Sequence, residues 1–250
     1  MHSIVLDTVA PLLPRESSRS QTQDDGKDSS IVALQEDNQG NTYALGRFNG
    51  RMWIGNIQVQ TNANQELFIT KHNKAGELIW FKQTQSNNRI NPTSLVIENN
   101  GDIVIGGYFQ GDSVFGTASV SSVGYGDNGF FSTLDANGNR KRVKAITNND
   151  GGTNQIFAIT TDENNNIYIA GNNTTNGYLD GQVAISTTPS TEIFILKTDS
   201  TGNRVRTTQT QNSSNVDQIN DIHYDNNGNI YMVGYTDGFV DFGATTLSSP

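Results

Sequence analysis

The feature that most constrains this chain is a turn followed by a strand, which recurs at a nearly constant spacing. Its clearest copy is Asp225–Tyr235, which reads DNNGNIYMVGY. Earlier copies end at Gly46, Gly107 and Gly171, and the last has Gly234 at the same place, so the spacings are 61, 64 and 63 residues. A period this regular indicates a repeat architecture.

The rest of each unit repeats as well. The repeated stretch is the turn and second strand of a hairpin. Eight residues after its strand glycine comes an apolar residue followed by glycine, at Ile54-Gly55, Phe115-Gly116 and Phe242-Gly243, with one insertion at Leu179-Asp180-Gly181. An apolar position follows at Val59, Val120, Ile185 and Leu247. Two further strands then flank a turn that contains glycine, as at 67–71 and 77–84. Each unit should therefore hold four main strands, A to D, joined by two tight hairpins (A–B and C–D) and one longer B–C loop.

Four-stranded sheets that repeat around a ring are the blades of a β-propeller. An immunoglobulin-like array would need seven strands per unit. We therefore predict an all-β chain, a β-propeller of four-stranded blades with a repeat of about 62 residues. The blades are expected at about 31–84, 93–146, 156–210 and 219–250, the last being incomplete.

Residues 1–30 differ from the repeats and are predicted to be a strand remnant followed by a polar linker. The stretch Asp7–Pro11 is similar to the closing segment of bacterial immunoglobulin-like repeats. The fourth copy stops before strands C and D, so we expect three blades and half of a fourth, in a fragment of a longer protein or with the missing half supplied from elsewhere. Pairing of Ile4–Val9 with the last blade is an alternative.

The repeat resembles the SBBP family of bacterial β-propeller repeats. The resemblance rests on the hairpin Asp225–Tyr235, the Asp-Phe-Gly at 241–243, the segment Glu192–Asn203 and the strand around Trp80, and it covers residues 31–250. The second copy departs most, with Val104 where tyrosine is usual. The resemblance implies an extracellular or cell-surface location, further blades in a parent chain, and no shared catalytic residues.

Charge and composition exclude some functions. The net charge of −9 opposes binding to nucleic acid or to an anionic membrane. The basic cluster Arg140–Arg142 with Lys144 is predicted to lie on a solvated strand face. The chain has no cysteine, so it has neither disulfides nor thiolate metal sites.

Calcium is the one cofactor that the turns suggest, and no other is expected. Asp225, Asn227 and Asn229 have the alternating spacing of an oxygen-ligand loop, but Thr236 stands where such a loop needs an acid. The alternative is an ordinary hairpin turn, in which Asp and Asn bond to their own backbone. The histidines His72 and His223 do not recur and are expected to be ordinary strand residues.

Aromatic residues supply the binding candidates. Tyrosines at one repeat position, Tyr43, Tyr168 and Tyr231, suggest packing between blades, with a ligand stripe as the alternative. Loops on a rigid scaffold carry recognition, so the predicted ligand-binding residues are the loop aromatics Trp53, Phe109, Tyr125, Tyr178 and Phe239.

We therefore predict a non-catalytic repeat module of a bacterial surface or secreted protein, which binds a protein or glycan or spaces other domains. The alternative is a carbohydrate-active hydrolase or lyase, which would need two converging carboxylates.

Overall fold

The computed structural model describes residues 28–148, 151–181, 183–186, 192–210, 217–225, 227–236, 239–242 and 245–248. Within these ranges every regular element is a β-strand, and no helix is long and apolar enough to cross a membrane. The predictions for residues 1–27, including the strand at Ile4–Val9, lie outside the described residues.

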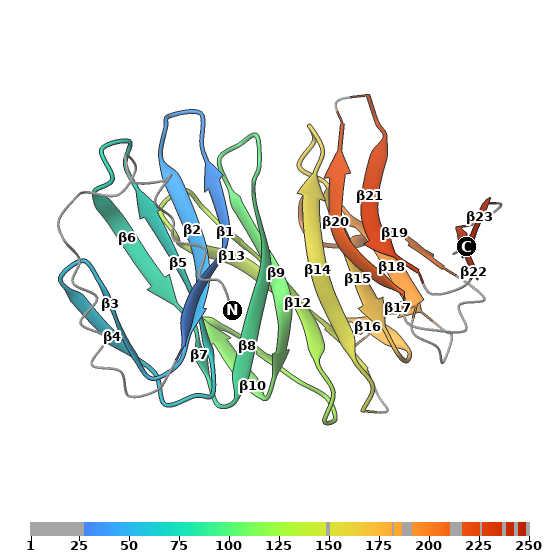
Figure 1. Cartoon of the computed structure of the whole chain (residues 1–250), viewed down its shortest axis with the longest axis horizontal. Helices are drawn as coiled ribbons and strands as arrows, with labels where there is room; N and C mark the ends of the chain where they lie inside the picture. The colour runs from blue at the N-terminus through green and yellow to red at the C-terminus, as the bar shows by residue number, and fades with distance from the viewer. Residues whose placement is uncertain are drawn as a thin grey trace.

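Four repeat units stand side by side along the long axis of the molecule (Figure 1). In each of the first three units, strands A to D pair antiparallel in chain order; in the fourth, β20 and β21 form a two-stranded sheet. Strand A is β1 (Ser29–Glu36), β8 (Arg89–Ile97), β14 (Asn154–Thr161) and β20 (Gln218–Tyr224). Strand B is β2 (Thr42–Phe48), β9 (Ile103–Gln110), β15 (Ile167–Asn173) and β21 (Ile230–Tyr235). Strand C is β5 (Glu66–His72), β12 (Asn128–Leu134) and β18 (Glu192–Thr198), and strand D is β6 (Leu78–Gln83), β13 (Arg140–Thr147) and β19 (Arg204–Gln209).

The B–C connection is more ordered than the loop we expected, because each one contains a short β-hairpin. These inserted hairpins are β3 (Arg51–Ile54) with β4 (Ile57–Gln60), β10 (Asp112–Phe115) with β11 (Ala118–Ser121), β16 (Gly177–Leu179) with β17 (Val183–Ser186), and β22 (Phe239–Phe242) with β23 (Thr245–Ser248). Gly55 and Gly116 open the first two hairpin turns with φ of 57° and 67°. Glycine reaches this region at little cost, which explains the recurring apolar–glycine pair.

Inserted hairpins also join neighbouring units. Strand β10 of the second unit pairs with β7 (Gln85–Ser86), which follows strand D of the first unit. Strand β16 of the third unit pairs with strand D of the second, with Leu179 opposite Ile146. The meander puts the A–B and C–D turns at one end of the strands. The inserted hairpins of the first three units therefore lie at the opposite end, toward the bottom of Figure 1.

The apolar cores lie between neighbouring sheets. One cluster joins the first and second units, for example Leu45 and Ile69 with Ile90 and Ile105, and two more join the second to the third and the third to the fourth. Tyr43 belongs to the first cluster and Tyr168 packs against the third, so this tyrosine packs between units in the first and third units, whereas Tyr231 of the fourth unit is exposed. Burial of each large apolar side chain contributes about 1.5–3 kcal/mol, so each unit is stabilised mainly by its neighbours.

Candidate functional site

The A–B turn of the first unit is built around Asp37. Its Oδ1 accepts hydrogen bonds from the backbone N–H groups of Gln39 and Asn41, at 3.0 and 2.9 Å. The hydroxyl of Tyr43 donates to Asp37 Oδ2 at 3.2 Å, and Lys71 Nζ lies 3.7 Å from the same oxygen. Burial alone would raise the pKa of Asp37, but the hydrogen bonds outweigh burial and lower it. We call this group of acid, tyrosine and strand-C lysine the clasp.

The clasp recurs in the third unit with Asp162, Tyr168 and Lys197. The Tyr168 hydroxyl lies 3.2 Å from Asp162 Oδ2 and 2.6 Å from Lys197 Nζ. In both clasps the ammonium group sits over the tyrosine ring, 4.9 Å from its centroid in the first unit and 4.7 Å in the third, a favourable cation–π geometry. The clasp therefore ties strand C to the turn between strands A and B.

The calcium hypothesis concerned Asp225, Asn227 and Asn229. The Asp225 carboxylate accepts hydrogen bonds from the backbone N–H groups of both asparagines and from Asn229 Nδ2, at 2.9, 2.7 and 2.8 Å. The side-chain bond from Asn229, followed by its backbone bond, lowers the pKa of Asp225. In these contacts the carboxylate accepts hydrogen bonds from N–H groups, as in a hairpin turn. A calcium site instead needs several oxygen atoms directed at the ion. In the described ranges, no three His, Asp or Glu side chains gather closely enough to hold a metal ion.

The second unit departs from this pattern because its turn carries two carboxylates. Glu98 and Asp102 stand where the other units have Asp and Asn, and both are buried. Lys141 pairs with Asp102, whereas Glu98 Oε1 has no hydrogen-bond partner among the described residues. Burial, together with the neighbouring Asp102, raises the pKa of Glu98 to about 7. Sequence reasoning missed this pair, although its departure from the repeat is visible in the sequence.

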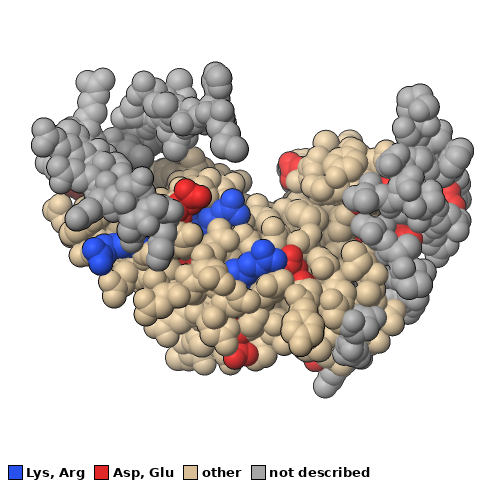
Figure 2. All heavy atoms as spheres, turned by 60° about the horizontal axis from the view of Figure 1, so that its bottom comes forward, with Lys and Arg blue, Asp and Glu red and all other residues tan. Residues whose placement is uncertain are grey.

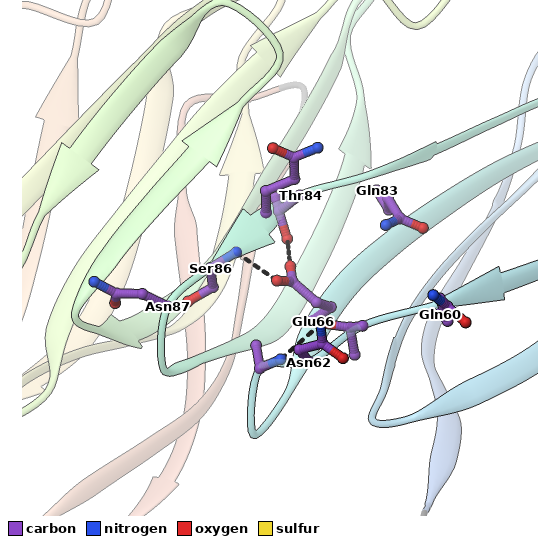
Figure 3. A pocket seen from close by; sticks show the side chains of 10 residues that line it. Gln60, Asn62, Glu66, Gln83, Thr84, Ser86 and Asn87 are labelled. Carbon is purple, nitrogen blue, oxygen red and sulfur yellow. Dashed lines mark hydrogen bonds between the residues drawn. The ribbon is translucent and has the colours of Figure 1, made fainter.

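A polar pocket of about 410 Å³ opens beside the first inserted hairpin (Figure 3). Its lining is dominated by amide and hydroxyl side chains, namely Gln60, Thr61, Asn62, Gln83, Thr84, Gln85, Ser86 and Asn87, with Ala63 and Glu66 completing it. Glu66 is thus the single acid among the ten lining residues. Such a pocket can donate and accept hydrogen bonds with an uncharged polar ligand.

Glu66 joins strand C to the chain that leaves strand D. Thr84 Oγ1 donates to Glu66 Oε2 at 2.5 Å, and the backbone N–H of Ser86 donates to Oε1, as the dashed lines in Figure 3 show. Burial raises the pKa of Glu66, and these hydrogen bonds oppose the rise. In the third unit Thr210 Oγ1 makes the same 2.5 Å bond to Glu192. The recurrence of a glutamate and a threonine at the same places in the first and third units was the signal in the sequence for this hydrogen bond. This recurrence of the Glu–Thr hydrogen bond indicates a role in the fold.

Phe109 was predicted to be a loop aromatic, but the structure places it within a strand. Strand β9 runs on to Gln110, so Phe109 lies inside the strand, opposite Ile90. Its side chain is fully buried and meets the ring of Phe130 edge-on, with centroids 6.3 Å apart. Strand B of this unit extends past the glycine that seemed to end it, because Tyr108 and Phe109 continue a good strand sequence.

Trp53 and Tyr178 occupy corresponding strands of two inserted hairpins. Trp53 on β3 is 57% exposed, whereas Tyr178 on β16 is half-buried and lies opposite Thr147 of the second unit. The difference follows from pairing: β16 bonds to a neighbouring unit, and among the described strands β3 pairs only with β4. Phe239 begins β22, and its side chain lies outside the described part of the chain.

Tyr125 is the most exposed of the candidates, at 98%. Its loop is nevertheless fixed, because the buried Asn128 side chain donates to the carbonyl groups of Gly126 and Val123 at 3.0 and 3.3 Å. A Cβ at Gly126 would lie 1.9 Å from the carbonyl oxygen of Gly152, so the two backbones touch. An aromatic side chain is thus presented to solvent by a rigid support.

Trp53, Tyr125 and Tyr178 lie on three different connections, and no ring contact joins them in the described part of the chain. The end of the sheets that carries the inserted hairpins is mostly uncharged, with a few basic groups next to acidic ones near its centre (Figure 2). The candidate surface therefore consists of separate polar and aromatic features.

The basic cluster is only partly solvated. Arg140 is half-buried, and its guanidinium lies 4.6 Å from the centroid of the Phe115 ring. Burial lowers the pKa of Arg140 to about 10. Lys141 and Lys144 each pair with a carboxylate.

The histidines have strand roles. The ring nitrogens of His72 lie 3.2 Å from the Gly76 carbonyl oxygen and 3.1 Å from Thr70 Oγ1. His223 is exposed on β20.

Comparison with known proteins adds one positive finding. No curated protein matches the chain. Residues 205–242 match a family model described as the SBBP beta-propeller repeat. The matched residues run from strand D of the third unit, through strands A and B of the fourth, to β22. The match therefore shows similarity to the SBBP beta-propeller repeat over residues 205–242.

Proposed function

We propose that this chain is part of a non-catalytic β-propeller module. It binds a partner through the end of the sheets that carries the inserted hairpins. In this proposal the four units are successive blades, three of them complete and the fourth begun. Support comes from the matched repeat, from sheets that share cores with their neighbours, and from hairpins that pair with the preceding unit.

The observation that carries the binding role is the fully exposed Tyr125 on its fixed loop. A large aromatic ring that faces solvent contributes much contact area at low entropic cost when it is covered by a ligand. A loop that is already rigid loses little further freedom on binding.

A glycan is the partner that the surface chemistry favours. The pocket beside the first inserted hairpin presents amide and hydroxyl groups. The end of the sheets that carries the inserted hairpins is mostly uncharged (Figure 2). Sugar hydroxyls bond to such groups, and sugar faces stack on aromatic rings. The charge of −9 speaks against nucleic acid and membrane partners. A location outside a bacterial cell belongs to the same proposal, because it rests on the family resemblance, and protease treatment of intact cells would test it.

A glycan array tests the proposal with the wild-type chain, Tyr125→Ala and the control Val205→Ala, which removes an exposed side chain from β19. We expect Tyr125→Ala to lose at least about tenfold in affinity for the bound glycan without a change in melting temperature, and Val205→Ala to bind like the wild type. Equal binding by both variants would contradict the role of Tyr125. Release of reducing ends from the bound glycan, lost in Glu66→Gln, would show a carbohydrate-active enzyme instead.

A further inference from the structure

The second unit has no clasp, because three substitutions remove it. The turn acid is a glutamate, the tyrosine position holds valine and the strand-C lysine position holds threonine, at Glu98, Val104 and Thr133. Two further residues bring in other groups. Asp102 stands at the turn position where the other units have asparagine, and Lys141 of strand D is the lysine that pairs with this turn. The turn of this unit therefore brings a lysine to two carboxyl groups.

Lys141 and Asp102 form the ion pair of this turn. The ammonium group of Lys141 is in direct contact with Oδ2 of Asp102, whereas the lysine nitrogen of the two clasps stays 3.7 and 3.5 Å from the carboxylate. Asn100 fixes the Asp102 carboxyl group: its Nδ2 donates to Oδ2 at 3.1 Å, and its Oδ1 accepts from the Asp102 backbone N–H at 2.8 Å. The Asp102 side chain is only 10% exposed. Its carboxyl carbon is therefore held next to an amine and away from bulk water.

Glu98 places a second ionisable group beside this pair. Its backbone N–H donates to the Asp102 carbonyl at 2.8 Å, so the two residues face each other across the turn with adjacent side chains. Glu98 is buried, and its Oε1 has no partner among the described residues. The charged groups that act on it are Asp102, Lys141 and Arg142; burial, followed by Asp102, raises the pKa of Glu98 to about 7. Near neutral pH this carboxyl group can both give and take a proton.

We propose that Lys141 and Asp102 form an intramolecular amide bond between Nζ and Cγ, with Glu98 as the proton carrier. Protonated Glu98 gives its proton to the Asp102 carboxylate and takes one from the Lys141 ammonium, which leaves an amine beside a neutral carboxyl group. The amine attacks Cγ, and the Nζ–Cγ bond forms. Glu98 then passes a second proton from this nitrogen to the leaving hydroxyl, the Cγ–O bond breaks and one water departs. Glu98 ends in its starting state, so the balance needs no other reactant.

Two features of the site promote this condensation. Contact between the amine and the carboxyl group makes the step intramolecular, which raises the effective concentration of the amine. Burial of Asp102 and Glu98 keeps bulk water from the product amide and slows its hydrolysis. The Lys141 side chain is 49% exposed, so the released water has a path to solvent. The bond ties strand D to the A–B turn, and it is independent of the glycan surface at Tyr125.

Intact mass spectrometry of the purified and unfolded full chain tests the proposal. We expect the wild type to be lighter than its sequence by one water. Lys141→Met, Asp102→Ala and Glu98→Gln should each have the full mass of their sequences, because they remove the amine, the carboxyl group or the proton carrier. Lys144→Met is the matched control: it breaks the 2.6 Å ion pair with Asp180 and should lose one water like the wild type. Far-ultraviolet circular dichroism checks that each variant is folded.

Digestion with chymotrypsin locates the bond, because this protease cuts after aromatic residues. Residues 82–108 contain Asp102, residues 132–157 contain Lys141, and neither segment has an internal aromatic residue. From the unfolded wild type the two segments should be released as one joined species, whereas the Lys141→Met chain should release them separately.

Three results would overturn the proposal. A wild type with the full mass of its sequence has not formed the bond. A loss of water that persists in Lys141→Met or Asp102→Ala arises elsewhere in the chain. A joined species that still forms in Glu98→Gln contradicts the role of Glu98 as proton carrier. The mass and the digest of the wild type decide whether the bond exists even where a variant fails to fold.

Discussion

The first and fourth units begin alike and end differently, and the difference separates what a repeat builds alone from what it needs a neighbour to build. Both close an A–B turn around an acid, Asp37 or Asp225, with nearly the same backbone hydrogen bonds. Yet Tyr43 is buried under strand C with Lys71 over its ring, and Tyr231 is exposed. The turn therefore forms from local sequence, whereas burial of strand B depends on strand C.

The largest expected effect comes from making the first unit resemble the fourth. Phe68→Ala removes the ring that lies on Gly46 and packs against Phe48 and Phe81. Loss of such a buried ring costs about 3–5 kcal/mol, measured as the free energy of unfolding in urea. The exposed Val205→Ala should stay within about 0.5 kcal/mol of the wild type. A similar loss in both variants would show that strand C is not what stabilises the first unit.

Replacing the equivalent tyrosine by alanine in the first and in the fourth unit tests whether its burial depends on strand C. Tyr43→Ala should cost about 3 kcal/mol because the side chain is buried in a core that two units share. Tyr231→Ala should cost less than about 0.5 kcal/mol because the side chain is exposed. Thermal melts of the two variants check this, and equal losses would mean that β21 is covered in solution.

The second unit allows a test by pH, because its turn holds Glu98 and Asp102. The pKa of Glu98 rises from the ordinary 4.5 to about 7 in the folded chain. The folded state then binds the proton more tightly than the unfolded state. This contribution to stability is fully present below about pH 4.5 and is lost as the pH rises through about 7.

In Glu98→Gln this pH-dependent contribution to the free energy of unfolding disappears. We expect the wild type to lose about 2 kcal/mol relative to this variant between pH 4.5 and pH 8, measured by urea unfolding at each pH. Glu36→Gln, at the exposed end of β1, should follow the wild-type curve. Parallel curves for wild type and Glu98→Gln would contradict the assignment of the raised pKa to Glu98.

The smallest effect concerns the clasp itself. Lys71→Met keeps the length of the side chain but removes the charge beside Asp37 and over the Tyr43 ring. We expect a loss of about 1 kcal/mol in the free energy of unfolding. Lys74→Met, in the exposed C–D turn, should be nearly neutral. If the two variants are equally stable, the clasp does not hold strand C to the turn.

Local sequence predicted the parts of the fold that form locally. The Asp–Asn–Gly turns and the paired strands follow from residue preferences within about ten positions. The inserted hairpins were missed as strands because each is only three or four residues long, although Gly55 and Gly116 marked their turns. Their pairing with the neighbouring unit joins residues far apart in sequence, such as Ile146 with Leu179, and no local pattern encodes it.

The candidate site was predictable to a similar extent. Tyr125 was singled out as an aromatic residue of a B–C loop, and its side chain is 98% exposed. The sequence alone did not distinguish Phe109 from Tyr125, because the burial of Phe109 depends on how far strand β9 extends. The paired carboxylates of Glu98 and Asp102 needed a comparison between units, because only the departure from the repeat reveals them.

Hydrogen exchange in strands β2 and β21 tests most directly the claim that strand C completes each unit. In β2 the amides that face β1 and those that face β5 are both bonded, so we predict slow exchange along the whole strand. In β21 we predict an alternation, with slow exchange at amides bonded to β20 and rapid exchange at those on the open edge. Uniform protection along β21 in the free chain would contradict the account.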